Sequence, residues 1–240
     1  MTTIFITGAN RGIGLEFTRQ YALDGGQVIA CCRQPSQSTA LQALAEKYRS
    51  IRIEALDVGD DQAISALAKK LEDTAIDILI NNAGIFSGRA TPVPPGNDDQ
   101  YQKFGAIDSN AWNKVLRINS IAPIMVTEAF MPHILRGKDR KVIMISSGMG
   151  SIEAIGAGAI AYRTSKAALN AGMRNIANAL EEQKIIVVSF HPGWVKTDMG
   201  GKGAQLEPDV SVKGMREVIA QLSIKQSSLF LDYRGKVLPW

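Results

Sequence analysis

The first 23 residues contain a short apolar run, then a glycine-rich turn, then a helical pattern. This succession constrains the fold more than any other feature of the sequence. Residues 3–7 are apolar and β-prone, which predicts a buried strand. Gly8, Gly12 and Gly14 follow, and a helical pattern comes next. Such glycines let a phosphate approach the backbone, while the helix N-terminus faces it with free N–H groups. An ordinary strand-to-helix turn has the same outline, but the strand context favours a phosphorylated ligand.

Strand and helix patterns alternate along the whole chain. The further β-prone runs lie at residues 27–32, 52–56, 76–80, 141–145 and 185–190. Alternation of this kind predicts a doubly wound parallel sheet, of about seven strands, with helices on both faces. We expect one α/β domain over residues 1–240, with a cofactor half over about residues 1–150.

A tyrosine and a lysine lie four positions apart in a predicted helix. Tyr162 and Lys166 therefore share one helical face. A free phenol, with a pKa near ~10, transfers protons poorly at neutral pH. A nearby ammonium group would lower that pKa toward the working range. The pair predicts a proton donor, although a solvated lysine beside a half-buried tyrosine has the same spacing.

Together these motifs resemble the short-chain dehydrogenase/reductase family. The matching positions are Thr7-Gly8, Gly12, Gly14, Asp57-Val58, Asn81-Asn82-Ala83-Gly84, Asn119, Ser146-Ser147, Tyr162, Lys166 and residues 192–197. Residues 191–201 and 238–240 narrow the likeness to the C-factor and sniffer-type carbonyl reductase branch. The resemblance implies a single-domain Rossmann fold that transfers a hydride between nicotinamide and a carbonyl or alcohol substrate. It also implies a homodimer or homotetramer, associated through the helices near Asn119 and Tyr162.

The resemblance assigns four residues to the reaction. Tyr162 would give its proton to the carbonyl oxygen, and Ser147 would hydrogen-bond and orient that oxygen. Lys166 would bind the nicotinamide ribose and acidify Tyr162. Asn119, in a helical run beginning near Asn110, would hold a water that links Lys166 to solvent.

The serine assignment carries one departure from the family. Ser147 and Tyr162 are 15 positions apart, counted as 162 minus 147, which is longer than the family usually has. The neighbouring Ser146 and Ser151 therefore stay open as alternatives, with Ser146 predicted to face the other side of the strand.

The resemblance also implies a set of cofactor contacts. Asp57 and Val58 would flank the adenine, and residues 192–197 would fix the nicotinamide carboxamide. For Asn82, a purely structural role between strands is the alternative. The full set is Gly8, Asn10, Arg11, Gly12, Ile13, Gly14, Arg33, Asp57, Val58, Asn82, Ala83, Gly84, Tyr162, Lys166, Pro192, Gly193, Val195 and Thr197.

The end of the second predicted strand indicates which nicotinamide cofactor is used. NAD enzymes usually place an acid there, on the ribose 2′-hydroxyl, but this chain has Cys32 and then Arg33. Arg33 and Arg11 could instead pair with a 2′-phosphate. At about 1.5–3 kcal/mol for each charge-assisted contact, the pair predicts that NADP(H) is preferred over NAD(H).

Two loop segments follow strand ends, where open α/β sheets bind ligands. Residues from about 86–107 and about 194–212 are predicted to form the substrate loops, and the second is predicted to act as a lid. Two roles stay open for Trp194, which are lining the substrate pocket and serving as a packing anchor. Two functional alternatives stay open: a nucleotide-binding signalling or regulatory protein of C-factor type, and a 3-oxoacyl thioester reductase.

Composition limits the partners and the location. The formal net charge is +4, but the basic residues are scattered, so no nucleic-acid partner is expected. No apolar run is long enough to cross a bilayer and no signal-peptide pattern is present, so no membrane partner is expected. Cys31 and Cys32 are predicted to be reduced core residues on opposite faces of a strand, in a cytoplasmic protein. His133 and His191 lack metal-ligand spacing, so no metal site is expected.

Overall fold

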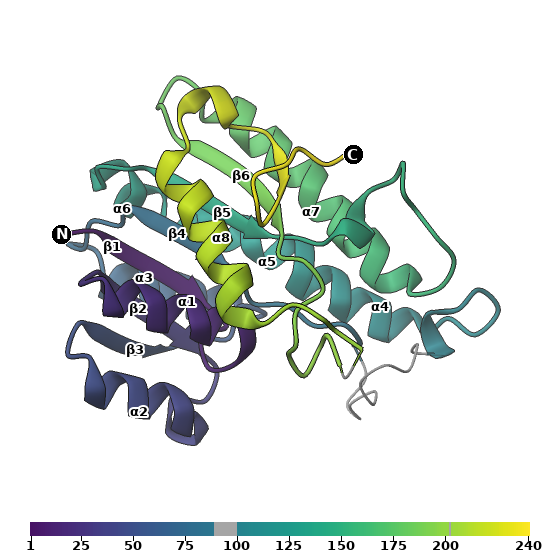
Figure 1. The fold of residues 1–240 in the computed structure, drawn as a ribbon, viewed down its shortest axis with the longest axis horizontal. Helices are drawn as coiled ribbons and strands as arrows, with labels where there is room; N and C mark the ends of the chain where they lie inside the picture. The colour runs from purple at the N-terminus through teal and green to yellow at the C-terminus, as the bar shows by residue number, and fades with distance from the viewer. Residues whose placement is uncertain (89–99, 202) are drawn as a thin grey trace.

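The β-prone runs assemble into one parallel sheet in the computed structural model, which describes residues 1–88, 100–201 and 203–240 (Figure 1). The strand order is β3-β2-β1-β4-β5-β6-β7, and this seven-stranded sheet confirms the predicted fold class. The strands are β1 (Thr3–Thr7), β2 (Gln27–Cys32), β3 (Ile51–Ala55), β4 (Ile78–Asn81), β5 (Lys141–Ile145), β6 (Ile186–His191) and β7 (Phe230–Asp232). Because β1 and β4 are neighbours while the chain winds outward from each, the order reverses between them, and their carboxyl ends form the switch point at which such folds bind ligands.

Helices cover both faces of the sheet and bury two separate apolar layers. On one face lie α1 (Gly12–Leu23), α2 (Thr39–Lys47) and α8 (Pro208–Gln221). On the other lie α3 (Asp61–Lys70), α5 (Ala122–Ala129), α6 (Met131–Arg136) and α7 (Ile160–Ala179), with α4 (Ser109–Leu116) packed beside α7. Cys31 and Cys32 are free, buried and divided between the two layers, as the strand period predicts.

The two predicted loops are only partly as expected. The predicted loop over residues 194–212 is wrong at its C-terminal end, because α8 begins at Pro208, a residue suited to the first position of a helix. The loop is also pinned by a short bridge between Val195 and Leu206. The middle of the first loop, residues 89–99, lies outside the described residues, and the chain returns as a short 3-10 turn over Gln100–Gln102.

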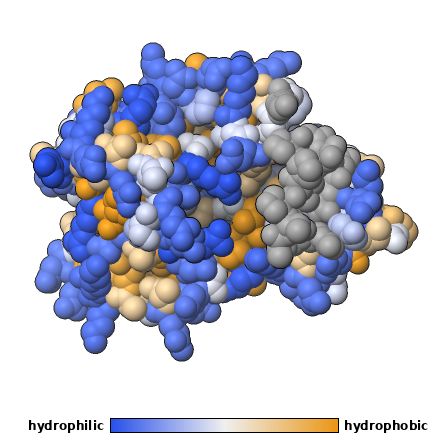
Figure 2. All heavy atoms as spheres, turned by 90° about the horizontal axis from the view of Figure 1, so that it is seen from below, coloured by the Kyte–Doolittle hydropathy of each residue, from blue (hydrophilic) through white to orange (hydrophobic). Residues whose placement is uncertain are grey.

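The molecular surface is mixed in polarity. Figure 2 shows hydrophilic side chains over most of the face seen from below, with apolar areas between them. Within the described ranges, no helix combines the length and the apolar character that crossing a bilayer requires. Association of copies through the helices near Asn119 and Tyr162 stays a prediction.

A side-chain amide joins the ends of the two central strands. Asn82 follows β4, and its Nδ2 donates to the carbonyl oxygens of Thr7 at 2.9 Å and Gly8 at 3.0 Å. In return, the Thr7 hydroxyl accepts hydrogen bonds from the backbone N–H groups of Asn82 and Ala83, both at 3.0 Å. The structural role considered for Asn82 is therefore present in the fold.

Replacing this amide should destabilise the protein. Asn82→Ala leaves two carbonyl groups without their donor, so we expect the free energy of unfolding to fall by about 1–3 kcal/mol. Urea denaturation measures this as a lower midpoint with an unchanged slope. The matched control is Asn113→Ala, at an exposed position of α4, which should change stability by less than about 0.5 kcal/mol. Equal midpoints for the two variants would contradict the stabilising role of the Asn82 amide.

Candidate functional site

The glycine-rich turn after β1 packs without room for side chains. Gly8 has a φ of +66°, in the left-handed region that favours glycine. A Cβ added at Gly14 would lie 2.3 Å from the Gly8 carbonyl oxygen and 2.4 Å from Asn82 Nδ2. Arg11, the N-cap residue of α1, makes no side-chain cap hydrogen bond. The N-terminus of α1 therefore has no cap from its N-cap side chain, and the binding of an anionic group there stays a prediction.

The segment after β6 meets this turn. The Thr197 methyl group would lie 3.2 Å from a Cβ added at Gly12. Thr197 is itself held by the turn it forms, because its Oγ1 accepts from the Gly200 N–H at 3.1 Å. At the start of the segment, the Pro192 carbonyl accepts from Ser211 Oγ at 2.6 Å. The structure thus brings Thr197, one of the predicted carboxamide-binding residues, to the glycine-rich turn.

Tyr162, Lys166 and Ser147 come together at the carboxyl end of β5. Lys166 Nζ donates to the Ile145 carbonyl at 2.8 Å and lies 5.8 Å from the centroid of the Tyr162 ring. The Ser147 side chain lies beside the Tyr162 phenol and favours its ionised form. Helix α7 supplies the first two residues on one face, as their spacing predicts.

Burial moves the pKa values of both groups. Desolvation raises the pKa of Tyr162 to about 12, and the opposing hydrogen bond with Ser147 is the weaker influence. The same cause lowers the pKa of Lys166 to about 8. The predicted fall in the tyrosine pKa is wrong for the protein by itself, because the loss of water outweighs the neighbouring cation. At neutral pH the phenol therefore keeps its proton.

Asn119 sits in an irregular part of its helix. The predicted helical run begins at Ser109, and α4 gives way to a π-helical turn over Arg117–Ile121 before α5 begins. The Asn119 amide is fully buried and exchanges two 2.8 Å hydrogen bonds with the backbone of Ile85. It also donates to Ser165 Oγ at 3.0 Å. The π-helical turn thus directs Asn119 across to the segment that follows β4, and such turns are frequent at functional sites.

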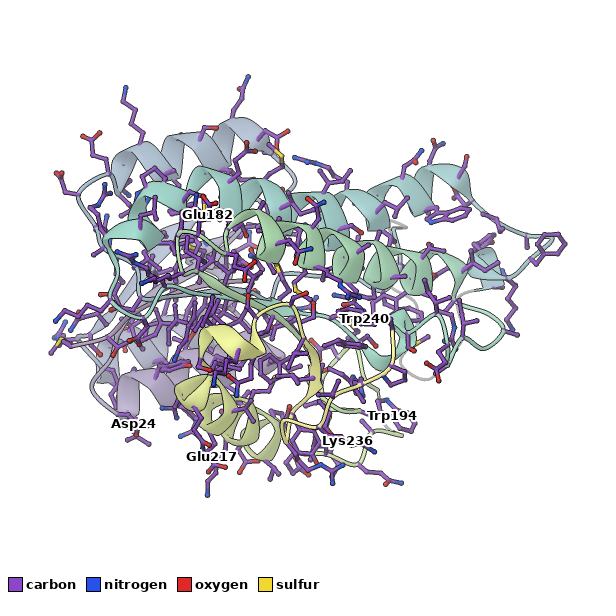
Figure 3. All side chains as sticks on the ribbon, turned by 90° about the horizontal axis from the view of Figure 1, so that it is seen from above. Asp24, Glu182, Trp194, Glu217, Lys236 and Trp240 are labelled. Carbon is purple, nitrogen blue, oxygen red and sulfur yellow. The ribbon has the colours of Figure 1, made fainter. Side chains whose placement is uncertain are left out.

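The three candidate serines have different surroundings. Ser147 begins a 3-10 turn, accepting from the Met149 N–H at 3.1 Å, and it reaches Tyr162. Ser151 turns away, donating to the Trp240 carbonyl at 3.2 Å and accepting from the Ala154 N–H at 3.2 Å. Figure 3 shows Trp240 in the segment that carries the C-terminus. The Ser146 hydroxyl is buried with no partner in the described part of the chain. Geometry therefore favours Ser147.

The predicted phosphate-binding arginines lie after adjacent strands. Arg11 follows β1 and the exposed Arg33 follows β2, and these strands are paired through their last residues. Arg11 also forms an exposed ion pair with Asp198 at 2.9 Å, which the sequence did not predict. An exposed pair of this kind contributes little to stability, so Arg11 can exchange its partner easily.

The remaining predicted contacts surround the same edge of the sheet. The Asp57 carboxylate accepts from the Gly59 N–H at 2.9 Å, and the neighbouring Val58 is buried. Ile13 packs against the apolar layer beneath α1. Trp194 is 58% exposed, and its indole N–H donates to the Gly200 carbonyl at 2.9 Å, so it anchors its own loop (Figure 3). In the described ranges, no group of three or more His, Cys, Asp or Glu side chains could hold a metal ion.

One polar residue beside Tyr162 was missed in the sequence. Gln102 is 3% exposed, and its Oε1 accepts from the Tyr162 backbone N–H at 2.8 Å. It comes from a segment that the sequence predicts only as a loop. No local pattern marks it, since its partner lies 60 positions away.

Comparisons with known proteins agree with this geometry. The model of the short chain dehydrogenase family matches residues 2–207. The C-signal protein of Myxococcus xanthus is 40% identical over 166 residues, covering 69% of this chain and 93% of that protein. The structure of carbonyl reductase Sniffer of D. melanogaster is 33% identical, with a TM-score of 0.89 over the whole of both chains. An NADPH-bound carbonyl reductase from chicken fatty liver is 35% identical, with a TM-score of 0.85 over 100% of this chain and 99% of that one. These matches confirm the predicted branch.

Proposed function

We propose that this chain, which belongs to the short-chain dehydrogenase/reductase family, is an NADP-dependent carbonyl reductase. Membership makes it an oxidoreductase of that family. One observation carries the finer proposal: the Tyr162 phenol is buried beside the Ser147 side chain and the Lys166 ammonium group. A protein that only bound a nucleotide would not need this arrangement.

The residues at the edge of the sheet fit a dinucleotide. The close packing at Gly8 and Gly14 and the N-terminus of α1, which has no side-chain cap, suit a pyrophosphate. Arg33 and Arg11 supply two guanidinium groups for a 2′-phosphate, which supports NADP(H) over NAD(H). The further proposed contacts are Asn10, Gly12, Ile13, Asp57, Val58, Asn82, Ala83, Gly84, Tyr162, Lys166, Pro192, Gly193, Val195 and Thr197.

The proton step follows from the charge states of the site. When bound, NADPH supplies the hydride for the carbonyl carbon. Tyr162, which is protonated at neutral pH with a pKa of about 12, donates its proton to the carbonyl oxygen. Ser147 hydrogen-bonds the same oxygen as negative charge develops on it. A protonated phenol supports reduction as the working direction.

Lys166 resupplies the proton. Its ammonium is fixed by the Ile145 carbonyl beside the Tyr162 ring, so it stabilises the phenolate that forms. With a pKa of about 8, it also gives up a proton more readily than an ordinary lysine does. Asn119 would hold the water that links Lys166 to solvent, from its position on the π-helical turn.

The similarity to C-signal supports a signalling or regulatory protein as a second function. A 3-oxoacyl thioester reductase is a further possibility within the same chemistry. The discriminating experiment titrates the purified protein with NADPH and NADH by nicotinamide fluorescence, then adds aldehydes, ketones, quinones and a 3-oxoacyl thioester. Substrate-dependent oxidation of NADPH supports the reductase and identifies the substrate class. Tight binding without turnover favours the signalling function, and no binding of either nucleotide contradicts both.

Removing the phenolic hydroxyl should abolish most of the turnover. Tyr162→Phe keeps the ring but has no proton to donate, so we expect kcat to fall by about 10²–10⁴-fold, with NADPH affinity almost unchanged. Steady-state rates with the best substrate of the panel measure this. The matched control is Tyr48→Phe, in the layer beneath α2 and away from the site, which should retain normal turnover. Normal turnover by Tyr162→Phe would show that another group is the acid.

The rate of reduction should depend on the ionisation of Lys166. Burial lowers its pKa from 10.5 to about 8, so the ammonium is present below that pH and is lost above it. We therefore expect kcat for carbonyl reduction to fall as the pH rises through about 8. Lys166→Met should be slower and should lack this inflection. A wild-type rate that stays constant well above pH 8 would argue against the relay.

Reversing the charge after β2 should change the cofactor preference. Arg33→Asp removes a partner of the 2′-phosphate and supplies an acceptor for the ribose hydroxyl. We expect the ratio of the Kd values for NADH and NADPH to shift toward NADH by about 10²-fold, since a charge-assisted contact is replaced by a repulsion. The exposed Arg49, beyond α2, gives the control Arg49→Asp, which should leave the ratio unchanged. An unaltered preference in Arg33→Asp would remove Arg33 from the phosphate site.

A further inference from the structure

The helix that carries Tyr162 and Lys166 has no cap of its own. The N-cap residue of α7 is Ala159, in the left-handed conformation with a φ of +48°, and it makes no side-chain cap hydrogen bond. The first N–H groups of a helix lack partners within the helix, and a nearby Ser, Thr, Asp or Asn usually accepts from them. Here Tyr162 is the third residue of that first turn, so its backbone depends on an acceptor from elsewhere.

Gln102 supplies that acceptor from a distant part of the chain. Its Oε1 accepts from the Tyr162 N–H at 2.8 Å, and its Nε2 donates to the Phe86 carbonyl at 3.0 Å. The side chain is buried, and a buried amide is costly unless its donor and acceptor are both satisfied. Both are satisfied here by backbone groups. The single amide therefore fastens the start of α7 to the segment that follows β4.

The same contact also sets a ring against the reacting phenol. The Phe86 ring lies 5.0 Å from the Tyr162 ring, centroid to centroid, with the planes tilted by 41°. Gln102 holds the backbone of both residues, and so joins the two segments that carry these rings. The Ser147 side chain also lies beside the phenol. Gln102 therefore positions Tyr162 through its main chain.

We propose that Gln102 is a positioning residue for the proton transfer of Tyr162. The inference rests on the proposed function, because it assigns Gln102 a role in a reaction that Tyr162 performs. Gln102 acts through the Tyr162 backbone and the Phe86 ring and does not itself exchange a proton. A displacement of a reacting group by about 1 Å is sufficient to slow a reaction about 10²-fold. Loss of the contact between Gln102 and Tyr162 should therefore affect the chemical step more than cofactor binding.

Three variants separate the two halves of the amide. Gln102→Met keeps the length of the side chain but removes the acceptor and the donor. Gln102→Glu keeps an acceptor for the Tyr162 N–H, in a position where a negative charge also suits the helix N-terminus, but loses the donor to Phe86. Gln100→Met is the matched control, since Gln100 is exposed and begins the same 3-10 turn.

The first readout is independent of any activity. Amide hydrogen exchange, followed by mass spectrometry on peptides that cover residues 159–166, reports whether the Tyr162 N–H is protected. Gln102→Met should speed this exchange by about tenfold, as expected for losing one hydrogen bond. Gln102→Glu and Gln100→Met should exchange as the wild type does. Unchanged exchange in Gln102→Met would overturn the anchoring contact itself.

The second readout is the single-turnover rate of hydride transfer at saturating NADPH. Gln102→Met should be about 10–100-fold slower, Gln102→Glu should be intermediate, and Gln100→Met should match the wild type. The Kd for NADPH should stay within about twofold in all three, which also shows that the variants are folded. A normal rate in Gln102→Met, despite faster exchange, would overturn the positioning role.

The double variant distinguishes positioning of the phenol from a general effect. When Tyr162→Phe has already removed the proton, Gln102→Met should slow the residual rate by no more than about twofold. A full 10–100-fold loss in that background would overturn the inference. If Tyr162→Phe alone keeps full activity, the role of Tyr162 as the acid fails and the positioning role fails with it, while the exchange data still show whether Gln102 holds α7.

Discussion

The burial of the Lys166 side chain is the constraint on which the arrangement of the site depends. An ammonium group removed from water is costly unless it is hydrogen-bonded, and here it donates to the Ile145 carbonyl at 2.8 Å. One glycine allows the close packing. A Cβ at Gly150 would lie 2.8 Å from the backbone carbon and Cβ of Lys166, whereas one at Gly84 would make an ordinary contact with its Nζ at 3.7 Å. The turns after β5 and β4 therefore close on the lysine from two directions.

Backbone hydrogen bonds relate this lysine to the phosphate end of the site. The Thr7 hydroxyl and the Asn82 amide tie the end of β1 to the end of β4, and Asn119 ties the next residues to the π-helical turn. These are buried or half-buried contacts between strand ends, whereas the Arg11–Asp198 pair is exposed and contributes little. The sheet thus sets the distance between the glycine-rich turn and Tyr162. The loops determine only what covers the site between them.

The sequence was sufficient to predict the parts of the site whose residues lie close together along the chain. The glycine-rich turn and the Tyr162–Lys166 pair are each set by spacing along a few residues, and the order of the strands follows from their alternation with helices. Gln102 and Asp198 could not be found in this way, because their partners are 60 and 187 positions away. The sequence-based prediction that the pKa of Tyr162 falls was wrong for a related reason. Burial depends on every element packed around the phenol, while the spacing reveals only the neighbouring cation.

The pKa shifts of Tyr162 and Lys166 have opposite directions but one cause, which is burial. Desolvation favours the neutral form of each, which is the protonated phenol of Tyr162 and the unprotonated amine of Lys166. With a pKa of about 8, Lys166 nevertheless carries its charge at neutral pH. A group that becomes negative nearby is therefore stabilised by this ammonium or by a proton. The substrate's carbonyl oxygen is such a group, because it takes up the π electrons of the C=O bond when a hydride adds to the carbon. The ammonium and the phenol are buried, so they interact more strongly with a negative charge than they would in water. They therefore stabilise the carbonyl oxygen most when charge develops on it, in the transition state. This lowers the barrier of the reaction and does more than bind the substrate.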